Sequence, residues 1–197
     1  LASGATHYTA PQGLMELRAA ICEKLRRDNQ LEYSPEEVIV TAGAQEGIYV
    51  AMLTLINPGD EVLCTSPGYT SYNQAIELAG GVVVSVNTYQ KDNFALTAEA
   101  VLAKITPRSR ILCLMNPSNP TGSVTPKSEI EKLAALAIEH DLIVISDEIY
   151  EQLVFDDAKV TKAVWIGNSM GGWVVWRAAL DVPDRVSGLV LVDTSGA

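Results

Sequence analysis

The stretch LIVISDEIY, residues 142–150, decides the fold, because an apolar strand runs directly into an acidic turn. Its first five residues form a run typical of a strand buried on both faces of a parallel sheet. Six similar runs occur in the chain: EVIVTA (37–42), EVLCTS (61–66), VVVSVN (82–87), RILCLMN (110–116), AVWIGN (163–168) and LVLVDT (189–194). Helical patterns lie between most of them, at 11–28, 45–56, 69–79, 126–140 and 171–180. The alternation predicts the α/β class, with three α/β/α layers around one mainly parallel seven-stranded sheet.

Composition limits the class of protein. The 197 residues, 48% of them hydrophobic, suit a single α/β domain over 1–197. The net charge of −10 argues against nucleic acid as a partner, and no apolar run reaches the roughly 20 residues that span a membrane. No signal-peptide pattern opens the sequence, and we expect expression in a bacterial cytoplasm, with the natural location left open. Cys22, Cys64 and Cys113 lie far apart without a CxxC pair, which favours free thiols over a metal site.

Candidate ligand residues follow the first two apolar runs. Ligands of parallel sheets bind beyond the carboxyl ends of the strands, where helix N-termini present free N–H groups. In TAGAQEG (41–47), Gly43 permits a tight turn, and the amides of Ala44 and Gln45 could hold a phosphate at a helix start. An ordinary strand-to-helix turn is the alternative. After the second run, Tyr69 is placed to stack on a planar ligand or to be a half-buried tyrosine.

Two later strand ends carry further candidates. The loop NPSNPTG (116–122) is fixed by two prolines and a glycine and carries Asn119. Loops this constrained at a strand end are seldom mere connectors. Asp147 ends a buried strand, with Tyr150 three residues on, and a carboxylate there needs a cationic or hydrogen-bonding partner. A protonated ring nitrogen would serve as that partner.

Together these stretches resemble the pyridoxal-phosphate-dependent aminotransferases of the aspartate aminotransferase fold type, classes I and II. The resemblance covers about residues 5–157 and rests on YTAPQGLMELR, TAGAQEG, PGYTSY, NPSNPTG and SDEIY, which occur in the family's order and approximate spacing. It implies that Ala44 and Gln45 lie at the cofactor phosphate. It also implies that Tyr69 stacks on the pyridine ring.

The polar groups of the cofactor ring have implied partners as well. Asn119 and Tyr150 match the residues that bond the ring's phenolic oxygen, and Asp147 matches the partner of the ring nitrogen. Asp147 would keep the pyridine protonated, which makes the ring an electron sink. Tyr8 matches the tyrosine that reaches a neighbouring subunit's phosphate, so a homodimer is implied.

The end of the chain departs from this pattern. The family continues with a strand and a serine-rich turn that carries the Schiff-base lysine, whereas here AVWIGN leads into SMGG and no lysine follows Lys162. Residues 160–197 instead resemble the nucleophile-elbow strand, the following helix and the next strand of the α/β-hydrolases. This resemblance implies Ser169 as a nucleophile, but no histidine follows it, so we expect only a remnant of that site.

The two resemblances lead to the expectation of an engineered chimera. An aminotransferase-like part, 1–159, and a hydrolase-like part, 160–197, would share one sheet in the strand order 3-2-4-5-6-7-1, with the seventh strand parallel. We expect a scaffold that is no efficient enzyme and has no functional cofactor and no metal. The alternative is a residual binder of phosphate or of weakly, non-covalently held pyridoxal phosphate, or a weak esterase that depends on Ser169.

Overall fold

The computed structural model describes residues 8–154, 163–168, 179–180 and 183–192. The chain divides into two compact units, Leu1–Val154 and Phe155–Ala197, and each has a sheet of its own. Among the described residues, no helix combines the length and the apolar character needed to cross a bilayer. All predicted ligand residues except Ser169 belong to the first unit.

The first unit is built on a four-stranded parallel sheet in the order β2-β1-β3-β4. Its strands are β1 (Glu61–Ser66), β2 (Val82–Asn87), β3 (Ser109–Met115) and β4 (Ile143–Asp147). These are the second to fifth predicted strands, and the part 3-2-4-5 of the predicted order is confirmed. Because all pairings are parallel, the carboxyl ends of the four strands lie at one edge of the sheet.

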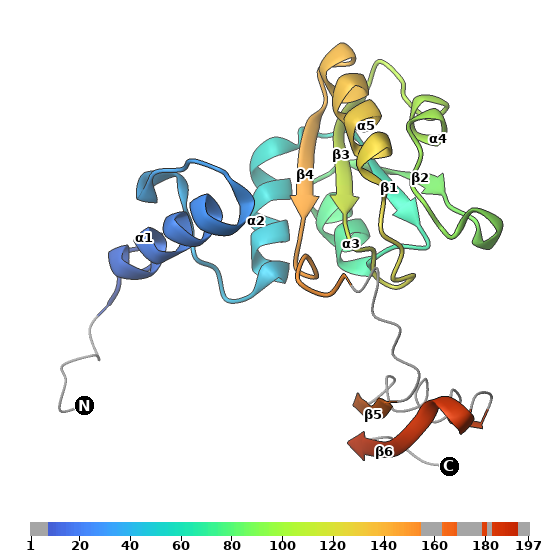
Figure 1. Cartoon of the computed structure of the whole chain (residues 1–197). Helices are drawn as coiled ribbons and strands as arrows, with labels where there is room; N and C mark the ends of the chain where they lie inside the picture. Colours follow the sequence, from blue (N-terminus) through green and yellow to red (C-terminus); the bar gives the residue numbers. More distant parts are fainter. Residues whose placement is uncertain (1–7, 155–162, 169–178, 181–182, 193–197) are drawn as a thin grey trace. The chain divides into compact units, whose positions relative to one another are not determined.

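Helices cover both faces of this sheet (Figure 1). They are α2 (Ala44–Leu55), α3 (Thr70–Leu78), α4 (Ala98–Leu102) and α5 (Lys127–Glu139). Met52 of α2 and Ile76 of α3 share one buried cluster with Val62 of β1. Leu133 of α5 shares a second cluster with Leu63, the next residue of the same strand. Successive side chains of β1 therefore pack on opposite faces of the sheet, and the three-layer α/β/α arrangement is confirmed for this unit.

The N-terminal helix α1 (Met15–Lys24) continues into a single π-turn, η1 (Leu25–Asn29). Leu14, the N-cap, and Leu17 are apolar but remain 53% and 45% exposed. The side chain that α1 buries is Arg18, whose Nη1 donates to the carbonyl oxygen of Pro35 at 2.9 Å. A hydrogen bond to the following loop therefore helps to hold this helix, while much of its apolar stripe stays exposed.

The prediction of a strand at 37–42 is wrong. The turn η2 (Pro35–Glu37) is a 3-10 helix closed by a capping box, in which Glu37 accepts the amide hydrogen of the N-cap residue at 2.8 Å. The amide of Val40 then donates to the carbonyl oxygen of Gln12 at 2.9 Å. The segment pairs with the N-terminal loop and not with the sheet. Its apolar sequence is compatible with either pairing and could not distinguish them.

The second unit contains β5 (Ala163–Asn168) and β6 (Val186–Val192), with the 3-10 turn η4 (Pro183–Arg185) before β6. The two strands pair in parallel, which confirms the predicted direction of the last strand relative to β5. The single seven-stranded sheet is not confirmed, because the described strands form one sheet of four and another of two. Most of the helix predicted at 171–180 lies outside the described residues.

Candidate functional site

Loops at the carboxyl edge of the four-stranded sheet carry most of the predicted ligand residues. The loops after β1 and β3 hold Tyr69 and Asn119, and β4 ends at Asp147, three residues before Tyr150. The ends of β3 and β4 are tied together, because the amide of Asn116 donates to the carbonyl oxygen of Asp147 at 3.0 Å. The parallel sheet thus gathers residues that are distant in the sequence.

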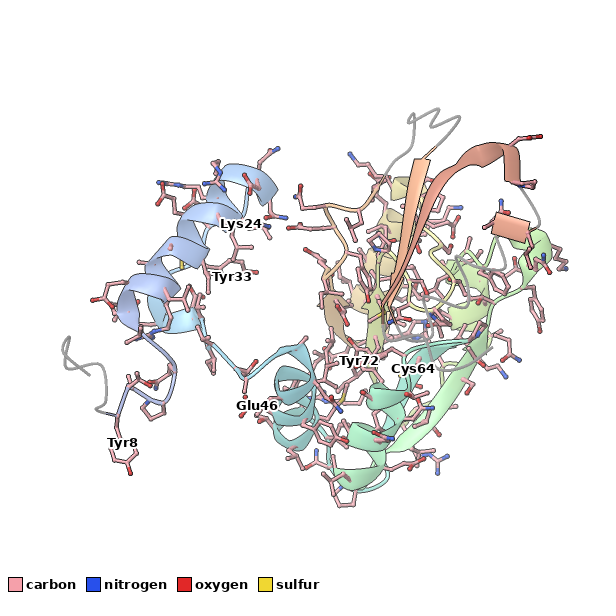
Figure 2. All side chains as sticks on the ribbon, turned by 90° about the horizontal axis from the view of Figure 1, so that it is seen from below. Tyr8, Lys24, Tyr33, Glu46, Cys64 and Tyr72 are labelled. Atoms are coloured by element: carbon pink, nitrogen blue, oxygen red, sulfur yellow. The ribbon has the colours of Figure 1, made fainter. Side chains whose placement is uncertain are left out.

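The Asp147 carboxylate is held by two hydrogen bonds. Tyr72 Oη donates to Asp147 Oδ2 at 2.9 Å, and the amide of Ile149 donates to Oδ1 at 3.3 Å. Tyr72 lies on α3 and is only 4% exposed (Figure 2). Burial and, next, the charge of Asp147 raise the pKa of Tyr72 well above its usual range, so the phenol remains a proton donor.

Tyr72 was missed by the sequence reasoning, although a signal for it exists. Tyr69 and Tyr72 are three residues apart at the start of a helix, a spacing that places two side chains on one helix face. Their rings meet edge to face, with centroids 6.4 Å apart and an interplanar angle of 82°. Tyr69 is half-buried and packs against the core cluster beside its partner. Tyr69 therefore packs against the ring of the tyrosine that holds Asp147.

The start of α2 lines the same pocket as Asp147. This pocket, of about 390 Å³, includes Ala44 and Gly47 of α2 together with Tyr72 and Asp147. Gly43 is the N-cap of the helix, and its φ of 95° is a conformation that residues with a side chain rarely adopt. The first amides of a helix have no partner within the helix and carry partial positive charge. The pocket therefore combines a carboxylate with a group of anion-attracting amides.

The exposed first turn of α2 also includes Glu46, labelled in Figure 2. Its Oε2 accepts the amide hydrogen of Ala42, which lies before the N-cap. The predicted residues Gly43, Ala44 and Gln45 are all exposed at this turn. Glu46 therefore ties the first turn of α2 to the residue before the N-cap, and the Ala44 and Gln45 amides point out of the helix start.

Asn119 and Tyr150 form a second polar pair at this edge of the sheet. Asn119 Nδ2 donates to Tyr150 Oη at 3.4 Å, and both side chains are half-buried. Together with Pro117 and Leu153 they line a pocket of about 290 Å³. The loop that carries Asn119 is fixed from within, because the amide of Gly122 donates to the carbonyl oxygen of Ser118 at 2.8 Å. Two neighbouring donors are therefore held in one pocket.

Other predicted residues lie apart from this edge or outside the described chain. Tyr8 is fully exposed near the N-terminus. Ser169 lies outside the described residues. Cys64 and Cys113 are free and buried on the neighbouring strands β1 and β3, and the hydrogen bond that the Cys113 thiol donates to Cys64, together with burial, raises the pKa of Cys113. Within the part of the chain that the structure describes, no three His, Cys, Asp or Glu side chains gather as a metal site would require.

Comparisons with known proteins give one consistent family. The profile described as "Aminotransferase class I and II" matches residues 1–193. Aspartate/prephenate aminotransferase of Thermus thermophilus is 46% identical over 156 residues, which are 79% of this chain and 40% of that protein. Aspartate aminotransferase of Bacillus sp. (strain YM-2) is 37% identical across 98% of this chain and 54% of that protein. The chain thus spans about half or less of these relatives.

Solved structures agree with the sequence relatives. Aspartate aminotransferase from Thermus thermophilus with maleate superposes with a TM-score of 0.76 at 46% identity, over 79% of this chain and 41% of that one. Aromatic aminotransferase from Pyrococcus horikoshii OT3 gives 0.77 at 42% identity, over 80% of this chain and 43% of that one. The likeness therefore extends from motifs to the fold of most of this chain.

These findings correct the expectation of an engineered chimera. The family match runs to residue 193, across the boundary expected after residue 159, so a separate hydrolase part at 160–197 is not supported. The relatives are named as enzymes, so the expectation of a scaffold that is no efficient enzyme is wrong. The expectation of no functional cofactor is also wrong, because aminotransferases require pyridoxal phosphate. The sequence pattern around Ser169 was misinterpreted because short strand-turn-helix patterns recur in unrelated α/β folds.

Proposed function

The chain belongs to the class I and II aminotransferases, and we propose that it carries the cofactor-binding part of an enzyme that moves an amino group from an amino acid to a 2-oxo acid. One observation carries the proposal. The Asp147 carboxylate, held by the Tyr72 hydroxyl, lines the same pocket as the start of α2. That pocket offers a carboxylate for a protonated ring nitrogen and helix amides for a phosphate.

Pyridoxal phosphate fits this set of groups. Its dianionic phosphate suits the turn at Gly43 and the amides of Ala44 and Gln45, where the helix dipole favours negative charge. Among the described residues, no atom beyond Gly43 and its chain neighbours lies within 4 Å of the point that a Cβ of Gly43 would occupy, so this part of the chain leaves the approach to the turn open. Its ring nitrogen, when protonated, suits the Asp147 carboxylate. The pocket volume of about 390 Å³ is in the range of small-molecule sites.

The ring's other contacts are assigned to the neighbouring loops. Asn119 and Tyr150 each have a donor for the phenolic oxygen of the ring, and their 3.4 Å contact supports a shared task. We assign Tyr69 to cover one face of the ring, which its half-buried place at the start of α3 supports. These roles assign one polar residue or pair to each polar group of the cofactor.

The chain's own residues hold the charges that the reaction needs. When bound, pyridoxal phosphate supplies an electron sink next to the carbon that loses its amino group. Asp147 keeps a proton on the ring nitrogen by pairing with it, and Tyr72 fixes the direction of that carboxylate. Asn119 and Tyr150 hold the ring oxygen by hydrogen bonds, which favours its ionised form. The amides at the start of α2 bind the phosphate and so fix the position of the ring.

A homodimer is part of the proposal. Tyr8 would reach the phosphate bound by the partner subunit, and its full exposure in the single chain supports a role outside its own unit. Sedimentation equilibrium of the 197-residue chain with and without pyridoxal phosphate measures this directly. A dimer that the cofactor stabilises is expected, and a monomer under both conditions would contradict this part.

Formation of oxaloacetate from L-aspartate tests the proposed activity. Two relatives are named for aspartate and one is solved with maleate, so a dicarboxylic donor is the first substrate to supply, together with pyridoxal phosphate and a panel of 2-oxo acids. Asp147→Ala should lower the rate by at least about 100-fold, as expected when a charge partner of the transition state is removed. The matched change Asp92→Ala, at an exposed carboxylate paired with Lys91, should leave it unchanged. Equal rates in both variants would overturn the assignment.

A further inference from the structure

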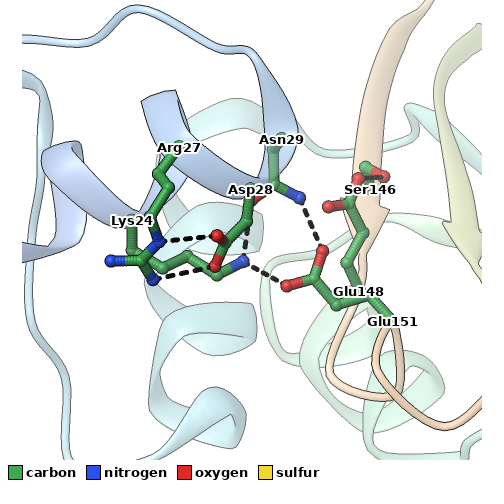
Figure 3. A network of polar contacts seen from close by, with 7 residues as sticks. All are labelled: Lys24, Arg27, Asp28, Asn29, Ser146, Glu148 and Glu151. Atoms are coloured by element: carbon green, nitrogen blue, oxygen red, sulfur yellow. Dashed lines mark hydrogen bonds and ion pairs between the residues drawn. The ribbon is translucent and has the colours of Figure 1, made fainter.

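A polar cluster joins the first helix to the turn that carries Tyr150. Lys24 Nζ donates to Glu151 Oε1, and Asn29 Nδ2 donates to Glu151 Oε2 at 2.6 Å. Lys24 Nζ also donates to Asn29 Oδ1 at 2.7 Å, so the three side chains close a triangle (Figure 3). The side chains of Lys24 and Glu151 are 35% and 24% exposed. The contacts are thus partly shielded from water, unlike most surface ion pairs.

The π-turn η1 makes this cluster possible. Lys24 ends α1 and Asn29 ends η1, and the wider turn brings these two side chains, five positions apart, into contact. Gln30 then stops the helix with a φ of 59°. Single π-turns are uncommon and often mark functional positions in helices. The helix end is therefore shaped to present two donors to one carboxylate.

The turn at Tyr150 has few other supports. Two backbone hydrogen bonds between residues three positions apart shape it. The Glu151 amide donates to the Glu148 carbonyl oxygen at 2.9 Å, and the Leu153 amide donates to the Tyr150 carbonyl oxygen at 2.8 Å. Among the described residues, the Tyr150 side chain has one polar contact, the long 3.4 Å contact with Asn119. Within the described residues, Glu151 makes the charged contacts of the turn to a distant element. Lys24 and, next, Asn29 lower the pKa of Glu151, so it is ionised at neutral pH.

We propose that Lys24, Asn29 and Glu151 act as a clamp that positions the Tyr150 hydroxyl for its bond to the cofactor ring. Glu151 follows Tyr150 directly, so fixing its carboxylate fixes the backbone from which the phenol projects. Glu151 is then a positioning residue that does not touch the cofactor. This inference rests on the proposed function, because it needs the ring oxygen as the partner of Tyr150.

Absorbance of bound pyridoxamine phosphate as a function of pH tests the clamp. This probe carries an amine in place of the aldehyde, so it binds without forming a Schiff base with a lysine. Its spectrum reports whether the ring hydroxyl is ionised. A donor to the ring oxygen favours the ionised form, so losing the donor raises the pH midpoint. We expect Glu151→Gln and Tyr150→Phe to raise the midpoint in the same direction and to weaken binding roughly tenfold. The double variant should show the same midpoint and the same affinity as Tyr150→Phe alone, because the two residues act on one contact.

The controls separate positioning from folding. Glu131→Gln removes a carboxylate from an exposed pair with Lys127 on α5 and should change neither the midpoint nor the affinity. Hydrogen exchange of the intact chain should be faster at 148–153 in Glu151→Gln and unchanged in β1 and β3. The charge swap Lys24→Glu with Glu151→Lys should restore part of the affinity.

Each outcome has one meaning. A lower melting temperature in Glu151→Gln with an unchanged midpoint and affinity would overturn the clamp and leave a structural contact. If Tyr150→Phe and Asp147→Ala also bind the probe as the unchanged protein does, the proposed cofactor site itself fails. If these two variants bind weakly and Glu151→Gln does not, only the positioning role is lost.

Discussion

At the scale of single residues, the bond between Tyr72 and Asp147 joins the core to the proposed cofactor site. Tyr72 is buried in the cluster under α2 and α3, while Asp147 lines the pocket. A buried phenol placed against a carboxylate fixes that carboxylate in one direction at little entropic cost, because the ring is already held by packing. The site is therefore preorganised by a residue that belongs to the core.

Tyr72→Phe should weaken pyridoxamine phosphate binding by about tenfold, because the Asp147 carboxylate loses its 2.9 Å donor. The free energy of unfolding should fall by roughly 1–2 kcal/mol for the lost hydrogen bond to a charged group. Calorimetric titration and urea unfolding measure the two effects. Tyr89→Phe, at an exposed tyrosine, is the control and should change neither. Unchanged affinity in Tyr72→Phe would separate Tyr72 from the site.

Glu61 is a buried carboxylate at the opposite end of β1, and it stabilises the fold. Its side chain is 4% exposed, and Arg108 Nη2 donates to Oε1 at 2.6 Å while Thr106 Oγ1 donates to Oε2 at 2.5 Å. The bond from Thr106 and then those from Arg108 lower the pKa of Glu61. A carboxyl group whose pKa is lower in the folded than in the unfolded protein stabilises the fold at pH values above its ordinary pKa of about 4.3. This stabilisation is lost as the pH falls through the pKa of the folded protein.

Glu61→Gln should therefore lower the free energy of unfolding by roughly 1–3 kcal/mol at neutral pH, a discounted range because Arg108 is 70% exposed. The difference from the unchanged protein should shrink below pH of about 4.3 and vanish at lower pH. Urea unfolding measured from pH 3 to pH 7 checks the curve. The exposed Glu77→Gln provides the baseline. A difference that stays constant with pH would contradict the role given to the Glu61 charge.

At the scale of elements, the start of α2 depends on one glycine. Gly43→Ala should cost roughly 1–3 kcal/mol in stability through backbone strain alone, because its φ is 95° and nothing lies near the added Cβ. It should also reduce the preference for pyridoxamine phosphate over pyridoxamine. Gly59→Ala is a matched control, with a φ of 90° and equally open space before β1. Urea unfolding should show similar losses in both variants, and a changed phosphate preference in both would contradict the local role of Gly43.

Elements were predictable where an apolar run had no competing local bonds. The runs that became β1 to β4 and the helices α2, α3 and α5 were placed close to their observed bounds. The run at 37–42 failed because the Glu37 capping box and the Val40 amide satisfy the backbone locally. The π-turn η1 was not predictable, because its signal is a set of side-chain contacts to Glu151, far along the chain.

At the scale of the whole molecule, the sequence motifs predicted which residues follow strand ends but not which ones touch. Asp147 was expected to need a partner, and among the described side chains Tyr72 bonds to it, a residue of PGYTSY to which no role was assigned. The expectation of a chimera was wrong because it rested on the segment around Ser169 taken by itself. The family match covers residues 1–193 of 197, so one short motif carries little weight in it.

The central claim is that the carboxyl edge of the four-stranded sheet binds pyridoxal phosphate through Asp147. The most direct measurement is calorimetric titration of the 197-residue chain with pyridoxamine phosphate, compared between the unchanged chain, Asp147→Ala and Asp92→Ala. The account predicts saturable binding to one site per chain, at least about tenfold weaker in Asp147→Ala and unchanged in Asp92→Ala. Absence of saturable binding, or equal affinity in all three proteins, would contradict it.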